Sequence, residues 1–215
     1  MTTTPGQRPM HRTTPAHGEQ TKARLVAVAR EMFGRSGHSG VAMQDVCAQA
    51  EVTRGALYHH FPGKDGLFRA VCEQVATDVT GRVAAAAQAR PDAWSRLVAG
   101  CRAFLEVSAE DDVRQILLTD GPSVLGWAQL RELDARHGLG LVKLGIRRAI
   151  EEGAIESGPV DTLAHMLVSA LNEAAMLIGR SANPNSARND AMRALDRILA
   201  GIAGKRQPPA ANLNL

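Results

Sequence analysis

Aromatic side chains are scarce, since two Trp, one Tyr and four Phe make up 3% of a chain of 215 residues. Cysteine is scarce too, and the three residues, Cys47, Cys72 and Cys101, show no CxxC spacing. This argues against a disulfide framework and against a zinc site. Cys47 and Cys72 fall on apolar helical faces, which predicts buried thiols.

Targeting and catalytic signatures are also missing. The N-terminus has no apolar signal core, and no apolar run approaches the roughly 20 residues that a membrane-spanning helix needs, so we expect a cytoplasmic protein. The sequence has no nucleophile elbow, Walker loop, GxGxxG turn or metal-ligand spacing. The adjacent His59 and His60 point to different sides of a helix and cannot chelate one ion. We therefore expect no enzymatic activity, no metal and no cofactor.

Positive charge is concentrated towards the N-terminus. Residues 1–68 hold eight Lys or Arg against five Asp or Glu, whereas the remaining 17 basic and 17 acidic residues cancel. Five of the seven His lie in the same stretch. A basic excess confined to one third of the chain agrees with binding to nucleic-acid phosphates.

The first 20 residues are rich in Thr, Pro, Gly and His, a composition that predicts a disordered arm over 1–20. Two interpretations of its basic side chains stay open. Arg8, His11 and Arg12 either reach into a minor groove or remain part of a solvated tail. A second loose segment is expected at the other end, over 205–215.

Helical periodicity first appears over 21–36, and two short helices should follow it. The apolar residues of 43–50 share one face of a helix. Thr53 is placed to cap the next helix, and Leu57 and Phe61 to anchor it inside. Two short helices joined by about three residues form a helix-turn-helix, whose second helix usually enters the DNA major groove.

The outward residues of that second helix are donors suited to phosphates or base edges, beside small residues that leave the backbone open. We expect Arg54 and His59 at base edges, because Arg can take guanine in bidentate fashion, and Tyr58 and Lys64 at phosphates. His60 is either a contact or a hydrogen-bonding residue at the core edge. The predicted DNA-binding residues are Thr53, Arg54, Gly55, Ala56, Tyr58, His59, His60 and Lys64.

This stretch resembles the DNA-binding domain of the tetracycline-repressor (TetR) family of bacterial transcriptional regulators. The shared pattern is Val-Ser/Thr-x-Gly-x-Leu-Tyr-x-His-Phe followed by a Lys, present here over 52–61 and at Lys64, and the close match covers about 25–68. Two positions depart from it. Ala42 stands where the family commonly has Thr, and Glu51 where Gly is usual in the turn. If that turn needs a left-handed residue, Glu51 strains it by roughly 1 kcal/mol.

The rest of the chain has helical periodicity and no strand-like alternation. We expect an all-α fold, in which a three-helix helix-turn-helix domain (21–66) is joined by a helix to a larger effector-binding and dimerisation domain (67–204). A break is expected at 120–122, where the sequence reads Asp-Gly-Pro, and a kink near Gly138. The helices expected in the larger domain cover 64–88, 92–108, 112–119, 123–152, 159–180 and 187–203.

The last two of these helices carry wide apolar stripes interspersed with small residues. The family resemblance implies that they pair across a two-fold axis as a four-helix bundle, so we expect a homodimer through 159–180 and 187–203. A dimer would read the two halves of a palindrome.

The resemblance also implies a pocket in the larger domain whose occupancy moves the dimer away from its DNA-binding spacing. With few aromatics and no basic cluster there, we expect an apolar or aromatic effector rather than a phosphorylated one. His137 and Asn172 are the informative polar candidates, because a polar group beside an apolar stripe needs a partner. The candidate ligand residues are Trp94, Cys101, Phe104, Leu117, Trp127, His137, Met166, Asn172 and Met176.

The function expected is that of a DNA-binding transcriptional regulator, in the first place a repressor released from its operator by a small effector. Two alternatives on the same fold stay open. One is a redox sensor with Cys101 or Cys72 as the reactive thiol, which peroxide would release from DNA unless the thiol were replaced. The other is an architectural DNA binder without an effector, marked by equal affinity for operator and random DNA.

Overall fold

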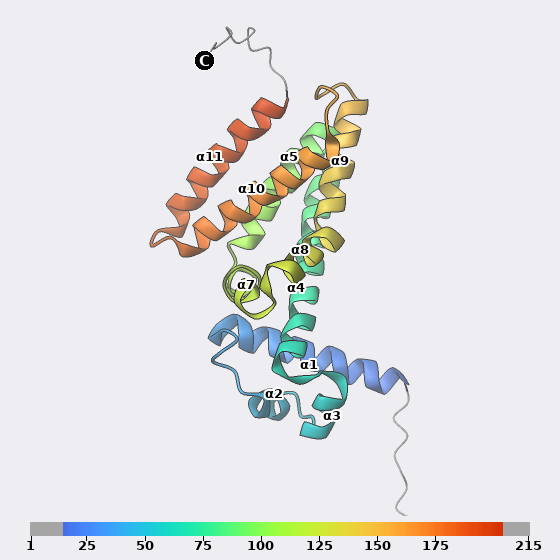
Figure 1. Cartoon of the computed structure of the whole chain (residues 1–215), viewed down its shortest axis with the longest axis vertical. Coiled ribbons are helices and arrows are strands. Elements are labelled where there is room, and N and C mark those ends of the chain that lie inside the picture. The colour runs from blue at the N-terminus through green and yellow to red at the C-terminus, as the bar shows by residue number, and fades with distance from the viewer. Residues whose placement is uncertain (1–14, 204–215) are drawn as a thin grey trace, which may run out of the picture.

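The structure, a computed structural model, describes residues 15–203, and within them it contains helices and no strand. The all-α prediction is thus confirmed. Figure 1 shows α1 to α3 gathered at one end, α4 leading away from them, and the last two helices packed together on one side. The elements in chain order are α1 (Pro15–Ser36), α2 (Met43–Gln49), α3 (Arg54–His60), α4 (Gly63–Gln88), α5 (Ala93–Ser108), α6 (Asp111–Val113), the π-helical η1 (Arg114–Asp120), α7 (Gly121–Val124), α8 (Gly126–His137), α9 (Leu139–Glu151), α10 (Val160–Arg180) and α11 (Pro184–Ile202).

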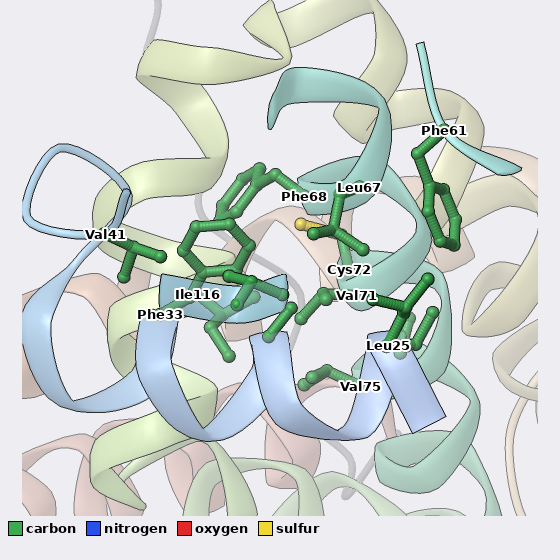
Figure 2. Close-up of a cluster of buried hydrophobic side chains, with 14 of the residues drawn as sticks. Leu25, Phe33, Val41, Phe61, Leu67, Phe68, Val71, Cys72, Val75 and Ile116 are labelled. Atoms are coloured by element: carbon green, nitrogen blue, oxygen red, sulfur yellow. The ribbon is translucent and has the colours of Figure 1, made fainter. Parts of the chain in front are cut away.

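A first hydrophobic core holds α1, α2 and α3 against the N-terminal half of α4. Phe33 of α1 meets Phe68 of α4 edge to face, with ring centroids 5.2 Å apart. Ile116 of η1 enters the same core and is fully buried (Figure 2). Each such side chain contributes about 1.5–3 kcal/mol by leaving water. Because α4 as far as Val79 belongs to this core, the boundary expected at residue 66 does not separate the cores.

A second core lies between α5, α9, α10 and α11. Leu105, Ile146 and Leu171 are buried in it, and Leu195 and Leu199 attach α11 to it. Phe104 of α5 packs against both cores. The two halves of the molecule are therefore joined through packed side chains and not only through the shared helix α4.

The first helix begins earlier than its apolar spacing predicts. It starts at Pro15 rather than at Thr21, and the Thr21 hydroxyl donates to the His17 carbonyl at 2.9 Å within it. Proline is tolerated in a first turn because its missing N–H has no partner there. The arm expected over 1–20 is therefore helical in its last residues, while Arg8, His11 and Arg12, like 205–215, lie outside the described residues.

The Asp-Gly-Pro stretch, where a break was expected, is the junction of η1 and α7, but the backbone stays helical through it. Gly121 keeps a helical φ of −49°, and the proline after it sits in the first turn of α7, where it needs no N–H partner. The backbone turns instead at Gly126, where φ is +76°. The kink expected near Gly138 is present as the junction of α8 and α9.

The last helix begins within the segment that was expected to be a turn. Pro184 is its first residue, and the Asn183 side chain caps it by accepting the N–H of Ser186 at 3.2 Å. An Asn cap followed by proline is a favourable helix start.

The apolar run in α10 is longer than expected. By length and composition, α10 is the one helix in the described part of the chain that could cross a membrane, a test that core helices of soluble proteins also pass. Its Leu167, Leu171 and Ala175 are buried in the second core. Met166 and Leu177, by contrast, are exposed. The composition of α10 therefore reflects two apolar faces, one turned into the protein and one turned outward.

Candidate functional site

The turn between α2 and α3 has a left-handed backbone at Glu51, where φ is +52°. No other non-glycine residue of the described part of the chain has a positive φ, so the strain of roughly 1 kcal/mol is present here. The exposed carboxylate approaches Arg24 of α1 only to 4.0 Å. Ala42 provides no side-chain cap for α2. Thr53 caps α3 as predicted, its hydroxyl oxygen accepting the Ala56 N–H at 3.2 Å.

Helix α3 is anchored on one side and open on the other. Leu57, and Phe61 just beyond the helix, are buried in the first core. Arg54, Tyr58 and His59 are exposed, Tyr58 to 44%. The Arg54 guanidinium lies 5.6 Å from the centroid of the Tyr58 ring, a cation–π distance that orients both side chains. The open side thus presents a cation, a phenol and an imidazole, which are donors for phosphate oxygens and base edges.

The other proposed contacts lie around this surface. A Cβ added to Gly55 would meet nothing within 4 Å, so packing within the chain does not require glycine there. His60 is half-buried and lies beside the first turns of α1, where a Cβ on Gly18 would be 3.9 Å from its ring. The Lys64 ammonium donates to the Ser39 carbonyl at 3.5 Å. Both side chains therefore stand at the edge of the exposed face of α3.

A cavity of about 670 Å³ opens in the larger helical half, with walls from α4, α5, η1, α8, α9 and α10. Most of its lining is apolar. Three large apolar side chains at the cavity also reach solvent, Trp127 at 60%, Leu141 at 37% and Leu144 at 43% exposure. This volume and lining suit a small organic molecule.

The structure places most of the ligand residues proposed from the sequence at this cavity: Cys101, Phe104, Leu117, Trp127, His137, Asn172 and Met176. Trp94 and Met166 are not among its walls. Trp94 packs against the second core, and Met166 is 65% exposed on α10. Helical spacing cannot distinguish two apolar faces of one helix, so the sequence did not separate these two residues from those at the cavity.

Both polar candidates have partners within the protein. His137 Nε2 lies 2.8 Å from Glu73 Oε2 on α4, and Asn172 Nδ2 donates to Asp134 Oδ2 at 2.9 Å. The sequence interpretation missed Asp134, a half-buried wall residue. Its spacing of three residues from His137 and four from Leu130 was the available signal. Burial raises the pKa of Asp134, and the hydrogen bond from Asn172 partly opposes this effect.

All three cysteines are buried, which confirms the prediction made for Cys47 and Cys72. Burial raises the pKa of Cys72 and of Cys101 to about 12. Burial and a raised pKa both oppose formation of the thiolate, the form through which oxidation proceeds.

Polar contacts tie α1 to the segment between α5 and α7. Arg30 of α1 donates to one carboxylate oxygen of Asp112 at 3.0 and 3.1 Å and also pairs with Asp78 of α4. Just past the end of α1, the backbone N–H of His38 donates to the Asp120 carboxylate at 2.7 Å. The segment formed by α6 and η1 is thereby fastened to the helix-turn-helix half.

The same segment borders the cavity. Ile116 is buried in the first core, whereas the next residue, Leu117, lines the cavity. On another side, a Cβ on Gly179 of α10 would lie 2.8 Å from the Arg114 side chain, so η1 packs tightly against α10. Helix η1 therefore contacts the first core, the cavity and α10 at once.

Two protein-family models match the chain. Residues 25–71 match "Bacterial regulatory proteins, tetR family", and 94–202 match "Tetracyclin repressor-like, C-terminal domain". A TetR-family transcriptional regulator from Pectobacterium atrosepticum is similar in structure, with a TM-score of 0.81 and 34% identity over 90% of this chain and 100% of that one.

Curated relatives are more distant or match over a shorter span. The Tn10 TetC protein of Escherichia coli is 24% identical over 149 residues, 69% of this chain and 75% of the relative. The HTH-type transcriptional regulator SrpR of Pseudomonas putida is 40% identical over 62 residues, which is 29% of either chain.

Proposed function

Because the chain belongs to the tetracycline-repressor (TetR) family of helix-turn-helix transcriptional regulators, we propose that it binds a palindromic operator as a homodimer, represses transcription there, and is released by a small apolar or aromatic effector. The exposed face of α3 carries this proposal. Its Arg54, Tyr58 and His59 stand over a buried anchor, in the position that presents donors to a major groove. A cytoplasmic location follows from the same role.

The contacts on DNA divide by chemistry. Arg54 and His59 read base edges, and Tyr58 and Lys64 hold phosphates, while Thr53, Ala56 and His60 border the contact. Gly55 lets the backbone come close, since the space beside it is empty. Phosphate contacts set position and salt dependence, whereas base contacts set sequence preference.

The outward side of α10 and α11 forms the dimer interface. Met166, Leu177 and Ile198 are exposed there to 65%, 58% and 44%. Large apolar side chains left exposed on a single chain are typical of a surface that a second copy covers. The apolar stripe on α10 and α11 supports the pairing expected for 159–180 and 187–203.

Effector release operates through η1. A ligand in the cavity contacts Leu117, and the neighbouring Ile116 is locked into the first core. Asp112, in α6 just before η1, pairs with Arg30 of α1, and Asp120 at the end of η1 accepts the backbone N–H of His38. Through these contacts a displacement of η1 moves α1. An effector that binds better to the shifted arrangement lowers the population that fits the operator.

The test is footprinting of the chain's own upstream DNA at fixed salt. We expect the wild type to protect a palindrome, Arg54→Ala to lose its preference over random DNA, and Tyr58→Phe to weaken binding to all sequences alike. Arg90→Ala is the charge-matched control, because Arg90 is exposed in the turn after α4, at the end of that helix away from α3.

Each outcome has a defined meaning. Equal protection of operator and random DNA by the wild type would identify an architectural binder and overturn sequence-specific regulation. A loss of specificity in Arg90→Ala as large as that in Arg54→Ala would show that total charge, and not the face of α3, selects the site.

A further inference from the structure

The inner wall of the cavity holds a carboxyl group without a cationic partner. Asp134 of α8 accepts one hydrogen bond, from the Asn172 amide at 2.9 Å. Within residues 15–203, no Lys, Arg or His nitrogen forms an ion pair with this carboxylate, whose one side-chain partner is the Asn172 amide. A carboxylate offers about four lone-pair positions, so one amide leaves most of its acceptor capacity unused.

The other ionic groups of the lining stand in a different setting. Arg131, Arg148, His165 and Glu173 are exposed to solvent. Arg96 is half-buried, and its guanidinium donates to the Arg90 carbonyl at 2.8 Å and to the Pro91 carbonyl at 3.3 Å. His137 is half-buried but already paired with Glu73. Asp134 is thus the half-buried acid of the lining that has no charged partner within the described residues.

We propose that the effector carries a hydrogen-bond donor, a hydroxyl or a protonated amine, on its apolar body, and that Asp134 accepts this donor at the cavity wall. The inference rests on the proposed function, since it assigns the chemistry of the effector for the same cavity. Asn172 is a positioning residue, because its amide holds Oδ2 and orients the carboxylate.

The physical reason is the cost of an unsatisfied buried acceptor. An apolar ligand that fills the cavity removes water from Asp134 and offers the carboxylate no hydrogen-bond donor in its place. A ligand with a donor restores the lost hydrogen bond, and a bond to a charged acceptor is among the stronger ones. The cavity should therefore discriminate by at least about tenfold in affinity between matched compounds with and without the donor.

The experiment is calorimetric titration of the full chain with three compounds that share one body: 4-hydroxybiphenyl, 4-(aminomethyl)biphenyl and 4-methoxybiphenyl. The wild type should bind the hydroxyl or the amine compound at least about tenfold more tightly than the methoxy compound. Tighter binding of the hydroxyl compound would indicate that the site takes a neutral donor, and tighter binding of the amine would indicate that it takes a cation.

Two substitutions locate the effect. Asp134→Asn keeps the shape and the bond from Asn172 but removes the charge, so the preference for the amine should disappear and that for the hydroxyl should shrink. Asp134→Leu removes the acceptor, so all three compounds should bind alike.

The results separate this inference from the proposed function. If the wild type binds all three compounds equally well, the role of Asp134 is overturned while the cavity remains an apolar effector site. If it binds none of them, the effector cavity itself is overturned. The footprint on upstream DNA tests operator recognition independently of both.

A measurement without ligand tells a recognition role from a structural one. A partly buried carboxylate whose hydrogen bonds are completed only by a ligand lowers the stability of the ligand-free protein. Asp134→Asn should therefore melt at the same or a higher temperature than the wild type. Glu73→Gln is the control, because it breaks contacts of 2.5 Å to Arg136 and 2.8 Å to His137 and should lower the melting temperature. A drop in Asp134→Asn as large as in this control would overturn the proposal.

Discussion

At the scale of single residues, the helix-turn-helix carries backbone strain at Glu51, whose carbonyl oxygen accepts a hydrogen bond of 3.4 Å from Arg24. Glu51 holds a φ of +52°, and its carboxylate is 86% exposed and 4.0 Å from Arg24. An exposed pair at that distance contributes almost nothing to stability. The left-handed conformation costs a non-glycine residue about 1–2 kcal/mol.

Glu51→Gly should therefore raise the free energy of unfolding by roughly 1 kcal/mol, because glycine adopts this conformation without strain. Urea denaturation followed by circular dichroism measures the change. Glu51→Ala is the matched control, since it also removes the carboxylate but keeps a Cβ, and it should give no such gain. Equal stability of the two variants would mean that the carboxylate, and not the backbone, sets the effect.

At Gly55, a substitution is expected to affect stability and DNA binding in opposite directions. Its surroundings are open, so Gly55→Ala should be accepted and should stabilise the free protein by up to about 1 kcal/mol through helix propensity. The added methyl group would stand between α3 and the DNA, so operator affinity should fall at least about tenfold. Thermal unfolding and a binding titration measure the two effects.

Gly81→Ala provides the control, because Gly81 is in α4 and a Cβ there also meets nothing within 4 Å. It should stabilise the protein in the same sense and leave operator affinity unchanged. A Gly55→Ala variant that binds its operator as tightly as the wild type would remove the close backbone approach from the proposal.

At the scale of elements, η1 is the segment on which both halves of the molecule meet. The Asp120 carboxylate accepts the His38 N–H at 2.7 Å and the Gln115 amide at 3.0 Å, which fixes the end of η1 to the loop after α1. Gly37, the residue before His38, has a φ of +68°, and a Cβ there would lie 3.1 Å from the Gln115 amide. Close packing and hydrogen bonds thus fix the position of the end of η1 relative to the loop after α1.

Asp120→Ala should lower the free energy of unfolding by about 1–3 kcal/mol, because it leaves a part-buried backbone N–H without its acceptor. Hydrogen exchange at His38 should accelerate in the same variant. Asp111→Ala is the control, since Asp111 is 88% exposed and pairs only with Arg114 three residues on. If the His38 amide exchanges at the wild-type rate in Asp120→Ala, the tie does not hold this loop.

At the scale of the whole molecule, α10 has apolar side chains on two sides. Its inner face completes the second core with Leu167, Leu171 and Ala175. Helix α11 packs beside α10 at the edge of the molecule (Figure 1), and its Ile198 is exposed as well. The outer face is where the proposed dimer forms.

Met166→Glu and Leu177→Glu together should convert the dimer into monomers, because dimer formation would bury two carboxylates against an apolar surface. Sedimentation velocity measures the state, and affinity for a palindrome should fall with it. Leu144→Glu is the matched control, since Leu144 is 43% exposed at the cavity. Monomers in this control, or dimers in the double variant, would contradict the assignment.

The helix-turn-helix was predictable from the sequence because its determinants are local. Capping by Thr53, the end of α1 at Gly37 and the anchoring of Leu57 depend on residues a few positions apart. Local spacing was insufficient at the Asp-Gly-Pro stretch and at Asn183-Pro184. In both places the same residues start a helix in one context and end it in another.

What the sequence by itself determined is the all-α class, the position of α3, its exposed donors and the buried state of the cysteines, because each follows from periodicity or from short motifs. Only the tertiary structure decided which side of α10 faces inward, which residues line the cavity, and that Asp134 and Asn172 meet. These features depend on contacts between segments such as α8 and α10, far apart in the chain. No spacing within one helix records which partner lies opposite it, so three-dimensional packing alone fixes those pairings.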